Sequence, residues 1–186
     1  MVQNMDKKIN VWESDALFVV PFWKTKIDNF TFKKKSIEKV LSTHREKPTQ
    51  LQTFTSNRGS DFIKPFREIF QEELNGFANT IKKHCEITDV WSTSYKTYQY
   101  HPYHNHGDVG LSGIIYLDLK EKMPNTVFVN SNPIWITGQT QYYDMAVEEG
   151  DMVIVPSHVG HFTAPNLSKK PKRIIAFDLN VIADTQ

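Results

Sequence analysis

The sequence predicts a single domain, residues 1–186, of mainly β structure: a double-sheet jelly roll with flanking helices. Three observations predict this fold. Short, β-branched apolar segments recur through the second half of the chain, turn residues separate them, and an amphipathic helix precedes them. That helix would cover one sheet and bury its outer face. The character of the chain changes near residue 87, which separates a part with one strand and supporting helices, residues 1–87, from a jelly-roll core, residues 88–186.

The N-terminal part contains one expected strand and two expected helices. The apolar run Ala16–Trp23 is interrupted by a proline, which suits an edge strand. Ser36–His44 is a candidate helix. A stronger helix follows Ser60 and Asp61, and the side chains of its apolar stripe recur at helical spacing. This stripe consists of Phe62, Phe66, Ile69, Phe70, Phe77 and Ile81.

The expected core strands are rich in β-branched and aromatic residues, and turn signals such as Glu149-Gly150-Asp151 separate them. The segment from Asn130 to Gln141, which contains Trp135, is expected to be a loop at the mouth of the barrel. The expected strands are Val90–Tyr100, Leu111–Leu119, Thr126–Asn130, Thr140–Val147, Asp151–Val155 and Arg173–Ile182.

Composition limits the partners of this protein. The formal net charge is +1, so no strong field would attract nucleic acid or a membrane surface. Cys85 is the only cysteine, which excludes an intramolecular disulfide and a cysteine-based zinc cluster. No run of 18 apolar residues occurs, and the first ten residues are polar. We therefore expect a cytoplasmic protein that binds neither nucleic acid nor membrane, and the apolar edge strand makes a homodimer conceivable.

Three histidines form a candidate metal site. His104 and His106 are two residues apart just before a strong strand, and residues at this spacing point to the same face. His161 follows a later strand, which a jelly roll can place beside the first pair. Three ligands on one face leave positions open for substrate and oxygen. His101 is interpreted as a residue of the loop that enters the site, and His158 as a neighbour or surface residue; neither is expected to be a ligand.

Arg173 opens the last apolar strand and is a candidate anion site. An arginine that points into a barrel is costly unless an anion meets it, and its planar guanidinium suits a carboxylate. The alternative is an exposed arginine at the start of a strand, in line with the basic residues that precede it.

The order and spacing of these phrases resemble the 2-oxoglutarate/Fe(II) oxygenase superfamily, most closely its prolyl-hydroxylase-like and phage or marine-microbial branches. The matching stretch runs from Trp91 to Asn180. It includes His104-Asn-His106-Gly, Leu111-Ser-Gly-Ile-Ile-Tyr116-Leu, Glu149-Gly-Asp-Met-Val-Ile-Val-Pro156 and His161-Phe-Thr-Ala-Pro165-Asn, and then Arg173 with its apolar strand.

This resemblance implies a double-stranded β-helix that binds Fe(II) and uses 2-oxoglutarate and O2 to hydroxylate a C–H bond of an unknown substrate, with a peptidyl proline as one family-level candidate. Arg173 would meet the far carboxylate of 2-oxoglutarate. Tyr116 matches a position that often helps to hold this carboxylate, and Tyr98 and Ser112 are further candidates for the same pocket.

The sequence departs from the usual family pattern at the second metal ligand, where most members carry an aspartate two residues after the first histidine. Here that position is His106, and a shifted reading of His106-Gly-Asp108 makes Asp108 the alternative second ligand. Two other functions stay open. One is a three-histidine, cupin-like dioxygenase without 2-oxoglutarate, and the other is a non-enzymatic jelly-roll binding module.

Overall fold

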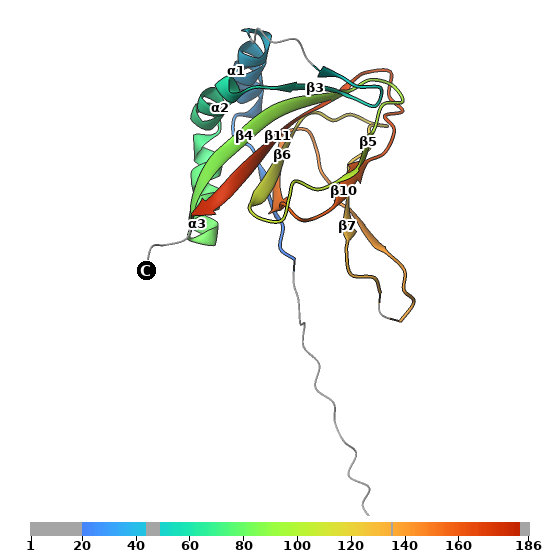
Figure 1. Cartoon of the computed structure of the whole chain (residues 1–186). Coiled ribbons are helices and arrows are strands. Elements are labelled where there is room, and N and C mark those ends of the chain that lie inside the picture. The colour runs from blue at the N-terminus through green and yellow to red at the C-terminus, as the bar shows by residue number, and fades with distance from the viewer. Residues whose placement is uncertain (1–19, 44–48, 135, 183–186) are drawn as a thin grey trace, which may run out of the picture.

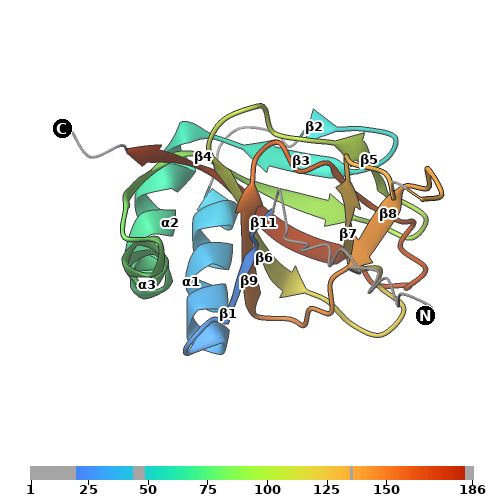
Figure 2. The same cartoon turned by 90° about the horizontal axis from the view of Figure 1, so that it is seen from below.

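Two antiparallel β-sheets face each other, and helices cover the outer face of the larger sheet (Figures 1 and 2). The structure is a computed structural model that describes residues 20–43, 49–134 and 136–182. Trp135 therefore lies outside the described residues. The arrangement is the mainly β jelly roll with flanking helices that the sequence predicts, so the predicted fold class is confirmed.

The larger sheet has seven strands in the order β1-β9-β6-β11-β4-β3-β2, and every pair of neighbours is antiparallel. The long strands β4 and β11 lie side by side along most of their length (Figure 1). The strands are β1 (Trp23–Lys26), β2 (Thr49–Gln50), β3 (Thr55–Arg58), β4 (His84–Tyr95), β6 (Leu111–Asp118), β9 (Asp151–Pro156) and β11 (Lys172–Ile182).

The smaller sheet has four short strands in the order β5-β10-β7-β8. β7 (Thr126–Asn130) has the bounds that the sequence predicts, and β8 (Gln141–Asp144) is shorter than predicted. The sequence analysis missed β5 (His101–His104) and β10 (His161–Thr163), because segments of four and three residues are too short to show an apolar alternation. Both missed strands carry histidines of the candidate metal site.

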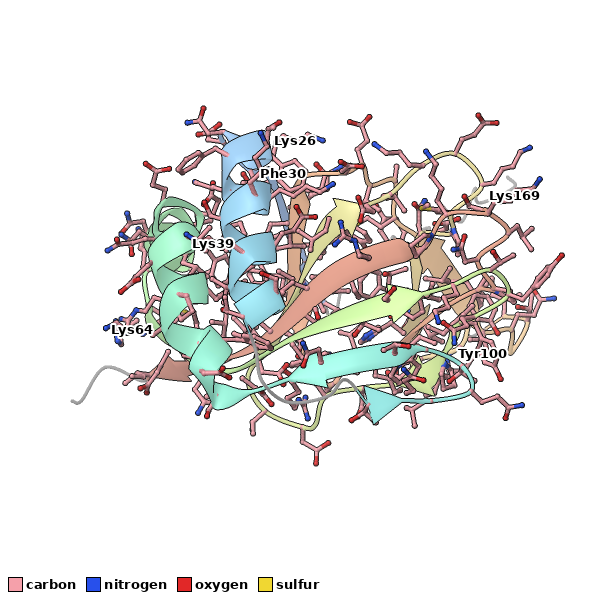
Figure 3. All side chains as sticks on the ribbon, turned by 90° about the horizontal axis from the view of Figure 1, so that it is seen from above. Lys26, Phe30, Lys39, Lys64, Tyr100 and Lys169 are labelled. Carbon is pink, nitrogen blue, oxygen red and sulfur yellow. The ribbon has the colours of Figure 1, made fainter. Side chains whose placement is uncertain are left out.

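The helices pack on the larger sheet, and exposed lysines such as Lys39 and Lys64 extend away from it (Figure 3). The predicted long helix after Asp61 is divided into a 3-10 turn (Ser60–Phe62), α2 (Ile63–Ile69) and α3 (Gln71–Ile81). The break falls at Phe70, whose φ of −107° and ψ of 21° are not helical. The apolar stripe survives the break, because Phe62, Phe66, Phe70 and Phe77 all remain buried.

The helix predicted at Ser36–His44 is longer at its start, since α1 spans Phe30–Thr43; His44 lies outside the described residues. The strand predicted at Ala16–Trp23 is displaced, because β1 begins only at Trp23, where that run ends. Residues 16–19 of the run lie outside the described residues. The residues before position 87 also contribute β1, β2 and β3 to the larger sheet, and position 87 itself falls inside β4.

Two apolar clusters lie on opposite faces of the larger sheet. The helix-side cluster joins Phe66 and Phe70 to Ile175 and Phe177 of β11. The inter-sheet cluster joins Tyr95, Tyr116 and Ile174 to Phe128 of the smaller sheet. Side chains that alternate along β11 therefore belong to different cores. Among the described residues, no helix has the length and apolar character that a membrane span requires.

Candidate metal centre

The three predicted histidines meet between the two sheets. His104 ends β5 and His161 begins β10, and these two residues are paired across the strands. His106 follows β5 in a turn that is held by a hydrogen bond from its backbone N–H to the carbonyl of Ser157, at 2.9 Å. One ligand atom from each histidine lies within 4.8 Å of the others. The structure thus brings together His104, His106 and His161.

Hydrogen bonds fix the orientation of each imidazole. Nδ1 of His104 lies 2.9 Å from the carbonyl oxygen of Pro102, and Nδ1 of His161 lies 3.1 Å from that of Val159. Nδ1 of His106 lies 2.8 Å from Oδ1 of Asp178. These oxygens only accept, so every Nδ1 carries the proton and donates it. In the neutral form of each ring, Nε2 is therefore the unprotonated nitrogen and is free to bind a metal, which is the tautomer that a histidine ligand needs.

The site also favours neutral imidazoles. Burial, together with the neighbouring histidines His104 and His106, lowers the pKa of His161 to about 3. Burial likewise lowers the pKa of His104. Neutral imidazole is the metal-binding form, so no proton would have to be displaced from these two rings at neutral pH. Three nitrogen donors of this kind suit Fe(II), Zn(II) and other divalent ions of the first transition row.

A cavity of about 650 Å³ opens beside the histidines. His101 lies in its wall, stacked between Phe54 and His104 with both ring centroids at 4.1 Å, and shares a 2.9 Å hydrogen bond with the hydroxyl of Tyr95. The lining residues with hydroxyl groups are buried, whereas the charged lining residues are at least partly exposed. The buried hydroxyl groups belong to Thr93, Tyr95, Thr126 and Thr163, and the charged side chains belong to Arg58, Asp89 and Asp178.

A buried cation lies next to Tyr95, one of the lining residues. Lys172 is fully buried, and its Nζ lies 5.5 Å and 5.6 Å from the ring centroids of Tyr95 and Tyr116. The ammonium donates a 2.7 Å hydrogen bond to the carbonyl of Pro124. Burial lowers its pKa to about 7, against a smaller opposite effect of Asp144. Among the described residues, no carboxylate lies within ion-pair distance of this ammonium, so an anion that entered here would relieve an uncompensated charge.

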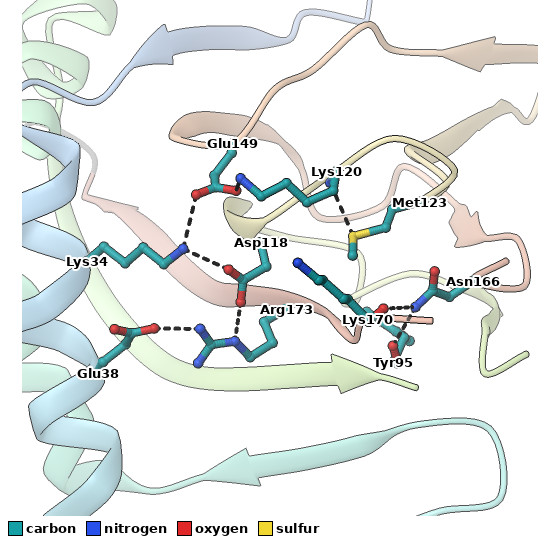
Figure 4. Close-up of polar contacts among 10 residues, drawn as sticks. All are labelled: Lys34, Glu38, Tyr95, Asp118, Lys120, Met123, Glu149, Asn166, Lys170 and Arg173. Atoms are coloured by element: carbon teal, nitrogen blue, oxygen red, sulfur yellow. Dashed lines mark hydrogen bonds and ion pairs between the residues drawn. The ribbon is translucent and has the colours of Figure 1, made fainter. Parts of the chain in front are cut away.

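Arg173 lies on the opposite face of the same strand, and the prediction that it points into the barrel is wrong. Its guanidinium donates to carboxylate oxygens of Asp118 and Glu38, and Lys34 of α1 joins the same network (Figure 4). These carboxylates already neutralise the arginine. The physical reason for the error is parity: adjacent residues of a strand point to opposite faces, and Lys172 takes the inward position.

The other predicted site residues are distributed unevenly. Tyr116 is buried, and its hydroxyl donates a 3.0 Å hydrogen bond to Oγ1 of Thr126. Tyr98 is 75% exposed and lies outside the cavity lining, because its backbone adopts a φ of 66° in a turn. Ser112 is buried beside Asp178. Asp108 is exposed and is not part of the histidine group.

Sequence reasoning missed Lys172, His101 and Tyr95. Lys172 was hidden in a basic run, where no sequence signal distinguishes the one lysine that turns inward from those exposed to solvent. Knowledge of how β11 pairs with β4 would have identified Lys172, because Lys172 is paired with Tyr95 and the two side chains lie on the same face of the sheet. His101 was interpreted as a loop residue near the site, and it proves to stack directly on His104.

A family model described as "Putative 2OG-Fe(II) oxygenase" matches residues 89–178. This segment runs from β4 to β11 and contains the three clustered histidines. Over this segment the chain resembles the 2-oxoglutarate/Fe(II) oxygenase family. The predicted resemblance is thereby confirmed for the family, while the phage or marine-microbial branch stays a prediction. No curated protein has a sequence that matches this oxygenase.

Solved structures of similar fold include several enzymes that use 2-oxoglutarate. HygX from Streptomyces hygroscopicus, with nickel and 2-oxoglutarate bound, has a TM-score of 0.67 at 10% identity, covering 87% of this chain and 83% of its own. The epimerase SnoN from nogalamycin biosynthesis has a TM-score of 0.67 at 9% identity, with coverages of 85% and 76%. A prolyl-4-hydroxylase from Pseudomonas putida has a TM-score of 0.59 at 8% identity, with coverages of 86% and 92%. At these identities the likeness establishes the fold.

The oxygenase family gives the chain its enzyme class, an oxidoreductase that uses Fe(II), 2-oxoglutarate and O2. Its candidate ligand set is unusual in this setting, because all three residues are histidines and none is a carboxylate. The carboxylate of Asp178 is connected to this set through its hydrogen bond with His106.

Proposed function

We propose that His104, His106 and His161 hold Fe(II), that Lys172 anchors 2-oxoglutarate, and that the enzyme hydroxylates a C–H bond of a primary substrate at the open end of the cavity. The observation that carries this assignment is the buried ammonium of Lys172, which lacks a carboxylate partner among the described residues and lies against Tyr95 of the cavity that contains the histidines. A dicarboxylate fits it, because one end can chelate a metal while the other end meets an ammonium.

The contacts that connect Lys172 with the histidines support this assignment. Lys172 lies against the ring of Tyr95, whose hydroxyl bonds to His101, and His101 stacks on His104. The distal carboxylate would accept hydrogen bonds from the Lys172 ammonium and from the hydroxyl of Thr126, which Tyr116 orients. Burial raises the pKa of Tyr116, so this phenol keeps its proton and can donate. Iron would supply the activation of O2 for oxidation of the C–H bond, and the chain supplies position and a dry cavity.

The primary substrate would approach from the rim formed by Arg58, Asp89 and Trp91. The guanidinium of Arg58 lies 4.3 Å from the Trp91 ring centroid and its Nε lies 3.1 Å from a carboxylate oxygen of Asp89. A peptidyl proline is one candidate substrate. The cytoplasmic location expected from the sequence, and the homodimer that the apolar edge strand allows, stay predictions beside this proposal.

An anaerobic titration tests the proposal. The protein is loaded with Fe(II), 2-oxoglutarate is added, and the visible charge-transfer band of the keto-acid chelate is recorded. Wild type should develop the band at saturation. Lys172→Met should need about 30-fold more 2-oxoglutarate or greater, the loss expected when the partner of a buried charge is removed. Arg173→Gln is the matched control, because it removes the neighbouring cation on the other face of β11 and should leave the affinity for 2-oxoglutarate within about twofold.

Three results would contradict parts of the proposal. A loss of affinity in Arg173→Gln but not in Lys172→Met would return the anion site to Arg173. Fe(II) binding without any band would favour the cupin-like dioxygenase that does not use 2-oxoglutarate. No binding of Fe(II) at all would favour the non-enzymatic binding module.

A further inference from the structure

The carboxylate that the metal ligand set lacks is present one hydrogen bond away. Asp178 of β11 accepts the Nδ1 proton of His106 on Oδ1 at 2.8 Å. The carboxylate side chain is 25% exposed and the imidazole is 9% exposed, so water screens this contact only weakly. His104 and His161, in contrast, donate to neutral backbone carbonyls. One of the three imidazoles is thus polarised by a full negative charge, and the other two are not.

A buried chain of hydroxyls fixes the position of this carboxylate. The hydroxyl of Ser112 donates to Oδ1 of Asp178 at 2.7 Å, and the hydroxyls of Ser112 and Ser157 are 2.8 Å apart. A serine hydroxyl has a single proton, so Ser157 must donate to Ser112. Oδ1 therefore accepts two hydrogen bonds, one from Ser112 and one from His106, which hold the carboxylate in position against the imidazole.

The same elements fix the position of His106. Trp91 stacks on the imidazole with ring centroids 5.3 Å apart, and the backbone N–H of His106 bonds to the carbonyl of Ser157. The backbone N–H of Ser157 in turn bonds to the carbonyl of Gly110. The imidazole of His106, the carboxylate of Asp178 and the hydroxyl of Ser112 therefore form one hydrogen-bonded network. The charge of the carboxylate can polarise the imidazole through this network without a change in geometry.

We propose that Asp178 is a positioning residue that donates negative charge to the metal through His106, and so replaces in the outer shell the carboxylate that the three-histidine ligand set lacks. This inference rests on the proposed function, because it needs a metal on His106. Through the hydrogen bond, Asp178 increases the basicity of the Nε2 atom that would face the metal. The bound ion should then be more electron-rich than an ion held by three imidazoles that donate only to neutral acceptors.

The test compares wild type with Asp178→Asn, which keeps the size of the side chain and an acceptor for His106 but removes the charge. Asp89→Asn is the matched control. Asp89 lies on β4 directly opposite Asp178 in the sheet and lines the same cavity, but it pairs with Arg58 rather than a histidine. Removal of the same charge at that position should have little effect on the metal, because no bonded path connects Asp89 to a ligand.

Two readouts are independent of turnover. Fe(II) affinity is measured by competition with a chromophoric chelator under argon, and Asp178→Asn should bind about 10- to 100-fold more weakly. At saturating Fe(II) and 2-oxoglutarate, the charge-transfer band of Asp178→Asn should shift to higher energy, because a less electron-rich iron gives up an electron less readily. Asp89→Asn should match wild type within about twofold in affinity and should leave the band in place.

A merely structural role would leave the band position unchanged at saturation, and this result would overturn the proposal. Equal affinity in Asp178→Asn and wild type would overturn it as well. If Asp178→Asn folds poorly, Ser112→Ala replaces it: loss of the hydrogen bond donated to Asp178 should shift the band in the same direction by a smaller amount, and an unshifted band would refute the inference. If wild type itself binds no Fe(II), the proposed function fails, which is distinguishable from these outcomes.

Discussion

Lys172 and Arg173, two neighbouring cations on opposite faces of strand β11, have opposite electrostatic environments. On the helix side, Arg173 is paired with Asp118 and Glu38 and is partly exposed. On the inter-sheet side, Lys172 is fully buried beside two tyrosine rings and lacks a carboxylate partner among the described residues. On the helix side, carboxylates therefore neutralise the cation. On the inter-sheet side, the cation has no such partner and can bind an anion. This difference predicts that substitutions on the helix side change stability and that those on the inter-sheet side change ligand binding.

The largest effect on the inter-sheet side is expected from His161→Ala. The variant removes one of three nitrogen donors, and Fe(II) affinity should fall by more than the factor of about 10 to 100 that is typical of outer-shell changes. Chelator competition under argon measures this affinity. Thermal unfolding of the metal-free protein should change little, and unchanged Fe(II) affinity would exclude His161 as a ligand.

The largest effect on the helix side is expected from Phe177→Ala. Phe177 is fully buried, its ring centroid lies 5.0 Å from that of Phe66, and the ring covers Gly113, where an added Cβ would lie 2.0 Å from it. Loss of this ring should lower the free energy of unfolding by about 3 to 5 kcal/mol, as measured by urea denaturation. Gly113→Ala, which forces the same ring to move, should cost about 1 to 3 kcal/mol. A stable Phe177→Ala variant with impaired 2-oxoglutarate binding would contradict the proposal that the helix side determines stability and the inter-sheet side determines ligand binding.

The buried ammonium should also make stability depend on pH. Burial lowers the pKa of Lys172 from 10.5 to about 7, so between these values the unfolded chain holds a proton that the folded chain has released. The contribution of Lys172 to the free energy of unfolding should therefore rise with pH across this window, by up to about 1.4 kcal/mol per pH unit. The measurement is the difference between wild type and Lys172→Met in urea denaturation at several pH values, without ligand. A difference independent of pH would mean that Lys172 is not strongly desolvated.

The smallest effect is expected from Arg173→Gln. The arginine raises stability through its ion pairs, and it holds the pKa of Asp118 low together with Lys34, against the effect of burial. Because more than a third of its side chain is exposed, solvent screens these pairs, and the loss should be about 1 kcal/mol or less. Differential scanning calorimetry would detect the corresponding decrease in Tm. A loss as large as that of Phe177→Ala would show that the network in Figure 4 is a major support of α1.

The fold and the histidine cluster could be predicted because their signals are local. Strands such as Leu111–Asp118 are long apolar segments, and His104 and His106 share a face by spacing alone. The anion site that we propose could not be predicted, because the choice between Lys172 and Arg173 depends on a single step of register against Tyr95 and Tyr116. The pairing with β6 also shifts between Arg173 and Ile174, where Leu117 of β6 is skipped, and no local pattern in the sequence reveals this bulge.

The sequence analysis failed to predict the helix break at Phe70 and the strands β5 and β10 for a related reason. Phe70 continues the apolar stripe on both sides of the break, so periodicity alone predicts one helix. β5 and β10 exist because they pair with each other and with β7, over segments too short to carry a pattern. Tertiary pairing, rather than local propensity, determines these elements.

The most direct test of the account is a crystal structure of the protein grown under argon with Mn(II) and 2-oxoglutarate. The account predicts that the ion is bound by Nε2 of His104, His106 and His161, and that the distal carboxylate of 2-oxoglutarate lies within 4 Å of Nζ of Lys172, the outer limit for an ion pair. A distal carboxylate bound at Arg173, or an ion ligated by Asp108, would contradict it.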